Sequence, residues 1–254
     1  MGSAPPLKDT FAGERPGFDD LPLRRGDPKA SAWGLWGDDD ELGTLNLLTP
    51  SIVKAAAAEI VTGETVALKL PDIAKKTITC RGVLLDWYSW ATQQGIQIDH
   101  FASHGIPLSQ LQAVPAAQRV QFRQGDVLLV RTGWLPAYNA LSEEQKAALP
   151  HRPARSSCGV EASEDTTRWH WDKAFAAVAS DTVAYEAWPS PRSWGVSMHE
   201  VFLSGWGMPI GESFDLEGLA AKCREAQRWS FMFVSMPLDI PGGVASPPGA
   251  MAIF

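Results

Sequence analysis

Segments of strand character alternate with segments of helix character from Thr49 onward, and this alternation constrains the fold more than any other feature. Thr49 and Pro50 precede an Ala-rich stretch that ends near Gly63, which predicts an N-capped helix. The alternating apolar residues of 65–70 predict a strand, and the run 127–131, which is apolar up to Arg131, predicts a buried one. Such alternation indicates an α/β or α+β layer fold around one sheet.

The remaining elements follow from the same periodicities. Further helices are expected over 86–94, 163–175, 197–203 and 215–225, and further strands over 82–85, 176–185 and 229–236. Ser142 and Gln145 have the spacing of a capping box, which predicts another short helix. Residues 1–32 are rich in Pro, Gly and charge and predict an extended N-terminal arm. We therefore expect one folded domain over 33–254.

Composition restricts the class of partner. The 254 residues include 22 basic and 29 acidic side chains, and no run of Lys or Arg exceeds two, which argues against nucleic-acid binding. The sequence has no signal pattern and no apolar stretch of membrane-spanning length. Cys80, Cys158 and Cys223 are widely spaced, which favours reduced thiols. We expect a cytoplasmic protein whose partner is a small molecule, with no nucleic-acid or membrane partner.

His199 and Glu212 form the strongest local candidate for a site. His199 lies near the start of a short predicted helix, and Glu212 follows a Gly- and Pro-punctuated turn that can fold back. A neutral imidazole and a carboxylate suit Zn²⁺ or Mn²⁺, and two more ligands would complete a metal site. On spacing alone, a capped helix followed by a loop with a surface Glu is the commoner interpretation.

His100 and His104 form a second candidate pair. Their spacing would place them on one face of a helix, but the Glu of H-E-x-x-H is missing, and Gly105 and Pro107 indicate a loop. Ordinary polar loop residues are the simpler interpretation. The sequence has no dinucleotide-binding, P-loop or nucleophile-elbow pattern.

Several stretches together resemble the cyclase family, which includes metal-dependent hydrolases similar to bacterial kynurenine formamidase and to isatin hydrolase. In chain order these stretches are 36–50, 81–86, 125–134, 186–189, 199–212 and 241–247. The resemblance implies a swivelling β/β/α-type α/β fold with a mixed core sheet. It also implies a divalent metal, Zn²⁺ or Mn²⁺, and hydrolysis of an amide or lactam such as N-formylkynurenine or isatin. His199 and Glu212 match the positions of two of the family's metal ligands.

The chain departs from the family between Leu70 and Arg81. There the family carries an H-x-G-T-H-x-D-x-P-x-H motif, or Q-W-D-G-x-x-H in its long branch, which supplies the other ligands and the catalytic His. Here the junction has no His and one carboxylate, Asp72. His100 and His104 do not replace the motif, because they lie in a region that the family also possesses. We therefore expect a core sheet reduced by the missing segment, and the catalytic residue stays unassigned.

Two functions remain open. The first is metal-dependent hydrolysis of an amide or lactam C–N bond, with His199 and Glu212 as metal ligands and with Arg131 and Trp134 as substrate contacts. A surface salt bridge for Arg131 and a core position for Trp134 are equally open. The second function is that of a metal-free pseudoenzyme or small-molecule-binding protein on the same scaffold. Loss of core strands would expose apolar surface, so we expect a homo-oligomer.

Overall fold

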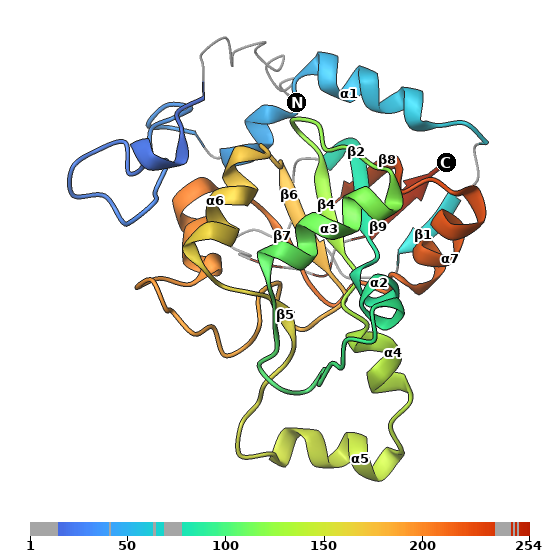
Figure 1. The fold of residues 1–254 in the computed structure, drawn as a ribbon. Coiled ribbons are helices and arrows are strands. Elements are labelled where there is room, and N and C mark those ends of the chain that lie inside the picture. The colour runs from blue at the N-terminus through green and yellow to red at the C-terminus, as the bar shows by residue number, and fades with distance from the viewer. Residues whose placement is uncertain are drawn as a thin grey trace, which may run out of the picture.

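A seven-stranded mixed sheet forms the centre of the computed structural model (Figure 1), which describes residues 15–40, 42–62, 65–68, 78–236, 245, 247 and 249–254. The strand order is β1-β9-β8-β2-β4-β6-β7. Strands β2, β4, β6 and β7 are parallel, whereas β8, β9 and β1 pair in antiparallel fashion. Their bounds are β1 Thr65–Leu68, β2 Ile78–Leu85, β4 Val127–Val130, β6 Ala177–Ser180, β7 Ile210–Gly211, β8 Ser230–Met236 and β9 Gly249–Ile253.

Helices lie on both faces of this sheet (Figure 1). They are α1 Pro50–Ala56, α2 Trp87–Gln93, α3 Leu108–Gln118, α4 Trp134–Asn139, α5 Glu143–Ala148, α6 Glu164–Asp172 and α7 Glu217–Ala226. Short 3₁₀ turns are η1 Phe18–Asp20, η2 Gly43–Leu47, η3 Ala57–Glu59 and η4 Leu149–His151, and η5 Glu200–Gly205 is a π-helical turn. A small parallel sheet joins β3 Gly105–Ile106 to β5 Gly159–Val160.

The central strands are buried on both faces, because successive side chains point to opposite sides of a sheet. Leu128 belongs to a core cluster with residues of α2, α3 and α6. Its neighbour Leu129 belongs to a second cluster with residues of α7, against which α1 packs Ile52 and Val53. Both leucines are fully buried, and each such side chain stabilises the fold by roughly 1.5–3 kcal/mol.

The described part of the N-terminal arm packs against α6 and η5. The ring of Phe18 meets that of Trp206 edge to face, with centroids 6.4 Å apart. The Trp206 indole donates a hydrogen bond to the Ala30 carbonyl at 2.8 Å, and the Trp171 indole donates to the Pro16 carbonyl at 2.9 Å. These contacts fasten the arm to the body, while the boundary at residue 32 stays a prediction.

The four parallel strands end at the same edge of the sheet, and each is followed by a charged residue. Asp86 follows β2, and Arg131 follows β4. Asp181 follows β6, and Glu212 follows β7. In α/β sheets, ligands bind outside the carboxyl ends of the strands. The topology therefore directs attention to this edge.

Most predicted elements are confirmed, with differences at their ends. The strand expected over 176–185 stops at Ser180, because the chain turns at Asp181 to form a hydrogen-bonded loop. The helix expected over 197–203 is the π-helical turn η5, and β9 was not predicted. Asp72 and the rest of 69–77 lie outside the described residues, as does most of the tail 241–247. Among the described helices, none combines the length and apolarity needed to cross a membrane.

Candidate functional site

Three side chains form a hydrogen-bonded line at the carboxyl edge of the sheet. His199 lies between two carboxylates: its Nδ1 is 2.6 Å from Glu186 Oε2, and its Nε2 is 2.9 Å from Glu212 Oε1. Glu186 is completely buried, whereas Glu212 is partly exposed. The carboxylate at Nδ1 fixes the orientation of the imidazole ring and directs Nε2 toward Glu212.

Each member of this line comes from a different part of the fold. Glu212 follows β7, whose register places Gly211 beside Ala179 of β6. His199 stands immediately before the π-helical turn η5, and its backbone N–H contacts Glu186 Oε1 at 3.3 Å. Glu186 lies in a segment that runs beside β5, and the close approach depends on Gly159. A Cβ at Gly159 would lie 2.4 Å from the carbonyl carbon of Glu186.

The two carboxylates decide the protonation of His199. Burial alone would lower the pKa of the imidazole, but the hydrogen bonds that it donates to Glu186 and Glu212 outweigh burial and raise the pKa to about 10. In the absence of another cation, His199 is therefore an imidazolium at neutral pH, and it donates from both nitrogens. His170 shows the opposite case, because it is buried without a carboxylate partner and its pKa falls to about 4.

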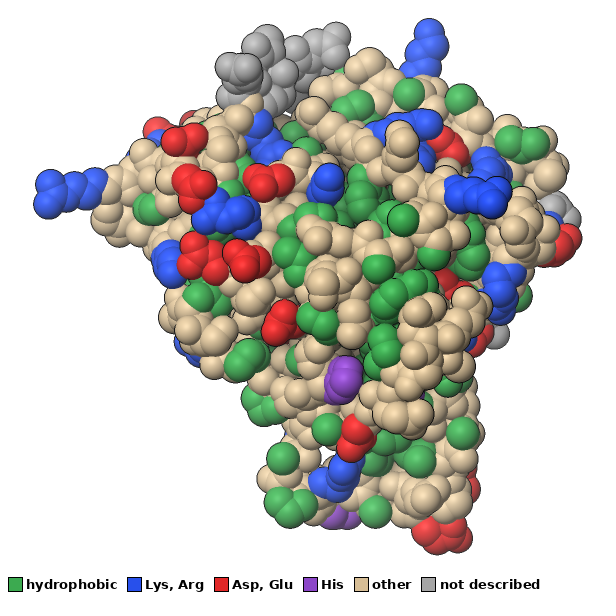
Figure 2. Space-filling model, viewed as in Figure 1, with side chains coloured by type: hydrophobic (Ala, Val, Ile, Leu, Met, Phe, Trp, Pro, Cys, Tyr) green, Lys and Arg blue, Asp and Glu red, His purple; other side chains and the backbone are tan. Residues whose placement is uncertain are grey.

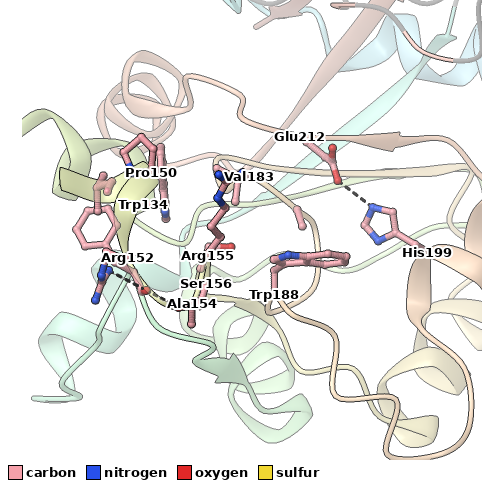
Figure 3. Close-up of a pocket in the computed structure, with 14 residues that line it drawn as sticks. Trp134, Pro150, Arg152, Ala154, Arg155, Ser156, Val183, Trp188, His199 and Glu212 are labelled. Carbon is pink, nitrogen blue, oxygen red and sulfur yellow. Dashed lines mark hydrogen bonds and ion pairs between the residues drawn. The ribbon is translucent and has the colours of Figure 1, made fainter. Parts of the chain in front are cut away.

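A cavity of about 620 Å³ opens beside His199 and Glu212, and both side chains line it. This volume is typical of sites for small molecules. The aromatic rings of Phe101, Trp134 and Trp188 form much of the wall. Figure 3 shows Trp188 next to His199, with Trp134 on the far side of the cavity. The cavity thus offers apolar ring surface next to a pair of polar donor atoms.

Trp134 lies at the cavity because hydrogen bonds to Asp181 fix the turn after β4. The buried Asp181 carboxylate accepts hydrogen bonds from the backbone N–H groups of Thr132 and Gly133, at 2.6 and 2.8 Å, and from the Thr132 hydroxyl at 2.8 Å. Burial raises the pKa of Asp181 to about 6, although these hydrogen bonds oppose the shift. The turn opens α4, whose first residue is Trp134. The predicted substrate contact at Trp134 therefore lies in the cavity wall, and its role stays a prediction.

Arg131, the other predicted substrate contact, does not line the cavity. Its Nε and Nη2 each lie 2.7 Å from a Glu217 oxygen, and its Nη1 lies 2.6 Å from Asp86 Oδ1. The guanidinium is nearly buried. Burial opposes its charge, but the Glu217 and Asp86 contacts prevail and raise the pKa of Arg131 further above its usual value. The structure places Arg131 in an ion-pair network rather than on a ligand surface.

His100 and His104 lie in a turn and loop before β3, as the second interpretation of this pair expects. Neither side chain lines the cavity beside His199. The backbone carbonyl of His100 accepts from Cys158 N–H at 3.0 Å, and the carbonyl of His104 accepts from Gly159 N–H at 3.1 Å. These backbone contacts hold the start of β5, directly after the cavity-lining Ser157.

The donor atoms of His199 and Glu212 suit a divalent ion in part. Zinc lies about 2.0–2.2 Å from nitrogen and carboxylate oxygen ligands in a tetrahedral arrangement, so two ligands of one ion are about 3.4 Å apart. Nε2 and Oε1 are 2.9 Å apart, which is the length of their hydrogen bond, so the two side chains would separate slightly to hold an ion. Glu186 at Nδ1 holds the imidazole as carboxylates commonly do at metal sites. Among the described residues, however, no group of three or more His, Cys, Asp or Glu side chains is placed to hold a metal ion.

Comparison with known proteins identifies the family. A family profile described as "Putative cyclase" matches residues 51–187, which is more than half of the chain. The chain belongs to this cyclase family. The matched range includes Glu186 and Trp134 but ends before His199 and Glu212. A search of curated proteins found no match.

Several solved structures share the fold of this chain. A crystal structure described as a novel cyclase has a TM-score of 0.72 and 23% identity, and the match covers 88% of this chain and 99% of that one. An isatin hydrolase bound to the product analogue thioisatinate has a TM-score of 0.51 and 14% identity. Isatin hydrolase A from Ralstonia solanacearum has a TM-score of 0.50 and 14% identity. The match covers 69% of this chain but 60% of each isatin hydrolase. The mixed cyclase-type α/β fold is confirmed, while the missing segment stays a prediction.

Sequence reasoning missed several residues of the site, among them Glu186, Trp188 and Arg155. Glu186 and Trp188 belong to the stretch 186–189 that carries part of the family resemblance, so a signal existed, although no role was assigned to them. Arg155 lies in the polar segment between η4 and β5, where neither periodicity nor a motif distinguishes it from an ordinary surface residue.

Proposed function

We propose that this protein hydrolyses the C–N bond of a small aromatic amide or lactam in the cavity beside His199. The observation that carries the proposal is the line from Glu186 through His199 to Glu212, which ends on the wall of an aromatic cavity at the carboxyl edge of the sheet. Family membership supports a hydrolase or cyclase activity of this kind. The proposed substrates are arylformamides and isatin-like lactams.

The proposed cofactor is a Zn²⁺ or Mn²⁺ ion held by His199 Nε2 and Glu212 Oε1. Such an ion polarises a carbonyl oxygen and lowers the pKa of a bound water. Glu186 keeps the imidazole in the orientation that presents Nε2 to the cavity. Trp134 and Trp188 supply flat apolar surface that binds an aromatic ring and excludes water around the reacting group. Water and substrate would supply further ligands, so we expect a weakly held, exchangeable ion.

The test combines metal binding with turnover. Purified protein is titrated with Zn²⁺ and Mn²⁺ by calorimetry, and hydrolysis of formanilide and isatin is followed in the presence of each ion. We expect one ion per chain, turnover with the ion present, and loss of both in the His199→Ala variant. The control is His151→Ala, because His151 is exposed and does not line the cavity. Metal-independent turnover, or no binding of either ion, would contradict the metal proposal.

The second candidate is a metal-free protein that binds an aromatic small molecule in the same cavity. The specific observation in its favour is the absence of a third protein ligand among the described residues. Under this alternative the wild type has no turnover, so His199→Ala changes only local packing and hydrogen bonds. Binding of an aromatic ligand without hydrolysis of any amide in the presence of either ion would favour it. The homo-oligomeric state and cytoplasmic location stay predictions under both.

A further inference from the structure

The cavity has two chemically different ends. At one end lie His199 and the carboxylate of Glu212. At the other end Trp134 is stacked on Tyr138, with ring centroids 5.1 Å apart and planes 9° apart. Trp134 also meets Phe101 edge to face, at a centroid distance of 5.9 Å. This stacking fixes the far wall, so a ligand that enters the cavity meets a rigid aromatic surface.

Two arginines line the cavity, and they differ in what they bind. Arg152 donates a hydrogen bond from Nη1 to the Phe101 carbonyl at 3.1 Å. The guanidinium of Arg155, by contrast, has no hydrogen-bond or ion-pair partner in the part of the chain that the structure describes. Figure 3 shows the Arg155 side chain between Trp134 on one side and Trp188 on the other. Arg155 is solvent-exposed, so its guanidinium is hydrated and available to a ligand in a wall that is otherwise largely apolar.

A second donor group lies in the same wall. The Ser157 side chain lines the cavity and is 1% exposed. Its hydroxyl has no hydrogen-bond partner among the described residues. A buried hydroxyl without a partner costs free energy, and rotation about χ1 gives it a choice of three staggered directions. Its backbone is fixed, because Ser157 N–H donates to the Trp188 carbonyl at 3.0 Å and Trp188 N–H donates to the Ser157 carbonyl at 3.0 Å.

We propose that the cavity selects an aromatic molecule that carries a carboxylate, and that Arg155 is the residue that determines this specificity. The carboxylate pairs with the Arg155 guanidinium and accepts from the Ser157 hydroxyl, while the ring lies between Trp134 and Trp188. Without a metal ion, the two carboxylates of Glu186 and Glu212 outnumber the single charge of the His199 imidazolium, so the other end of the cavity has a net negative charge that disfavours the carboxylate. Charge complementarity therefore sets the orientation of the ligand and turns its remaining substituent toward His199.

The inference rests on the proposed function only for the nature of the group that reacts at His199. The recognition of the carboxylate is a binding property, and it is measured without turnover. The probes are 2-aminobenzoate and 2-aminobenzamide, which have nearly the same shape and differ in charge. Calorimetry gives the affinity of each for the wild type, for Arg155→Gln and for the matched control Arg152→Gln, with and without added Zn²⁺.

We expect the wild type to bind 2-aminobenzoate about tenfold more tightly than 2-aminobenzamide, which is the lower range for a hydrogen bond to a charged group. Arg155→Gln should remove this preference, and Arg155→Lys should restore part of it. Arg152→Gln should retain it, because Arg152 is already bound to the Phe101 carbonyl. For a formylated 2-aminobenzoate that is turned over, Arg155→Gln should raise KM and leave kcat nearly unchanged.

Three results would overturn the inference: equal affinity of the wild type for both probes, no binding of either probe, or a preference that persists in Arg155→Gln. If the persistent preference appears only with added Zn²⁺, the carboxylate binds the metal at His199 and Glu212 instead of Arg155. A protein that hydrolyses no amide but shows the Arg155-dependent preference contradicts the proposed hydrolase and supports the inference. A protein that hydrolyses formanilide but binds both probes equally supports the proposed hydrolase and contradicts the inference.

Discussion

A basic side chain lies between two carboxylates at two places on the carboxyl edge of the sheet. Arg131 lies between Asp86 and Glu217, and its charge is enclosed by packing. His199 lies between Glu186 and Glu212, and its ring lines a cavity. In each case one carboxylate is almost or fully buried, and the other side chain is 38% exposed. The two bridges therefore share one arrangement of charges, although Arg224 also pairs with Asp86, and they differ in access to a ligand.

This difference separates the roles of the two bridges. Arg131 has no contact with the cavity, and Ser89 takes a further hydrogen bond from it at 3.2 Å, so it joins β4 to α2 and α7. His199 has its Nε2 on the cavity side, where exchange of Glu212 for another partner needs no rearrangement of the core. Under the proposed function, the first bridge contributes to stability and the second to binding and chemistry.

The largest effect is expected from Glu212→Gln. The amide keeps the size of the side chain but removes the charge that would hold a divalent ion, so the rate of amide hydrolysis should fall by about a thousandfold, which corresponds to about 4 kcal/mol. Because Glu212 is partly exposed, the free energy of unfolding should change by less than about 1 kcal/mol. Steady-state kinetics and urea denaturation measure the two quantities. Unchanged turnover would remove Glu212 from the site.

Arg131→Met should act in the opposite way. It leaves the buried carboxylate of Asp86 with the more exposed Arg224 as its remaining cation, at 2.9 Å. Breaking a buried ion pair from one side costs about 3–5 kcal/mol, and urea denaturation should show a loss of this order. The protein that stays folded should bind 2-aminobenzoate like the wild type. If the folded variant bound 2-aminobenzoate more weakly than the wild type, Arg131 would be a substrate contact, as the sequence suggests.

His170 shows what happens to a buried imidazole that has no carboxylate. Its Nδ1 donates to the Thr166 carbonyl at 2.7 Å, so its Nε2 is free to accept from the Tyr185 hydroxyl, also at 2.7 Å. Burial lowers the pKa of His170 to about 4. The unfolded chain therefore binds the proton more tightly, and stability is lost as the pH falls from about 6.5 toward 4. Between about pH 7.5 and 4.5 the loss from this group is roughly 2–3 kcal/mol.

The measurement is the free energy of unfolding as a function of pH for the wild type, His170→Gln and the exposed His151→Gln. Burial raises the pKa of Asp126 and of Asp181 to about 6. Because their folded pKa values are raised, they add stability at low pH and oppose the effect of His170. The difference between wild type and His170→Gln isolates the imidazole. An unchanged pH profile in His170→Gln would show that this ring does not titrate on unfolding.

The sequence predicts the fold best where local signals and burial agree. The apolar run 127–131 after a Gly-Asp turn becomes β4, and the capping box at Ser142 opens α5 as expected. Strand β9 escapes prediction because Gly249–Ile253 contains Gly and Ala, which have weak strand preference. It forms because β8 and β1 pair with it from either side. Such pairing is a long-range property that a local pattern does not carry.

The site was predictable to a smaller extent. The pairing of His199 with Glu212 came from family resemblance, since spacing alone favoured a structural loop. Glu186 joins them only because a segment beside β5 runs close to Gly159. For Arg155 and Arg131, the sequence shows that the side chain is charged but not what it contacts. In the structure Arg155 lines the cavity, whereas Arg131 pairs with two carboxylates. Whether an arginine recognises a ligand is decided by tertiary contacts.

Glu217→Gln gives the smallest expected effect and the sharpest control for the comparison. Glu217 has the same exposed fraction as Glu212 and likewise bonds a basic side chain, but it does not line the cavity. Because the amide retains one hydrogen bond to Arg131 and Asp86 still neutralises the guanidinium, the free energy of unfolding should fall by about 1 kcal/mol or less. Turnover and 2-aminobenzoate affinity should match the wild type. If Glu217→Gln reduced turnover as strongly as Glu212→Gln, the effect would arise from the charge of the sheet edge as a whole, and access to the cavity would no longer distinguish the two bridges.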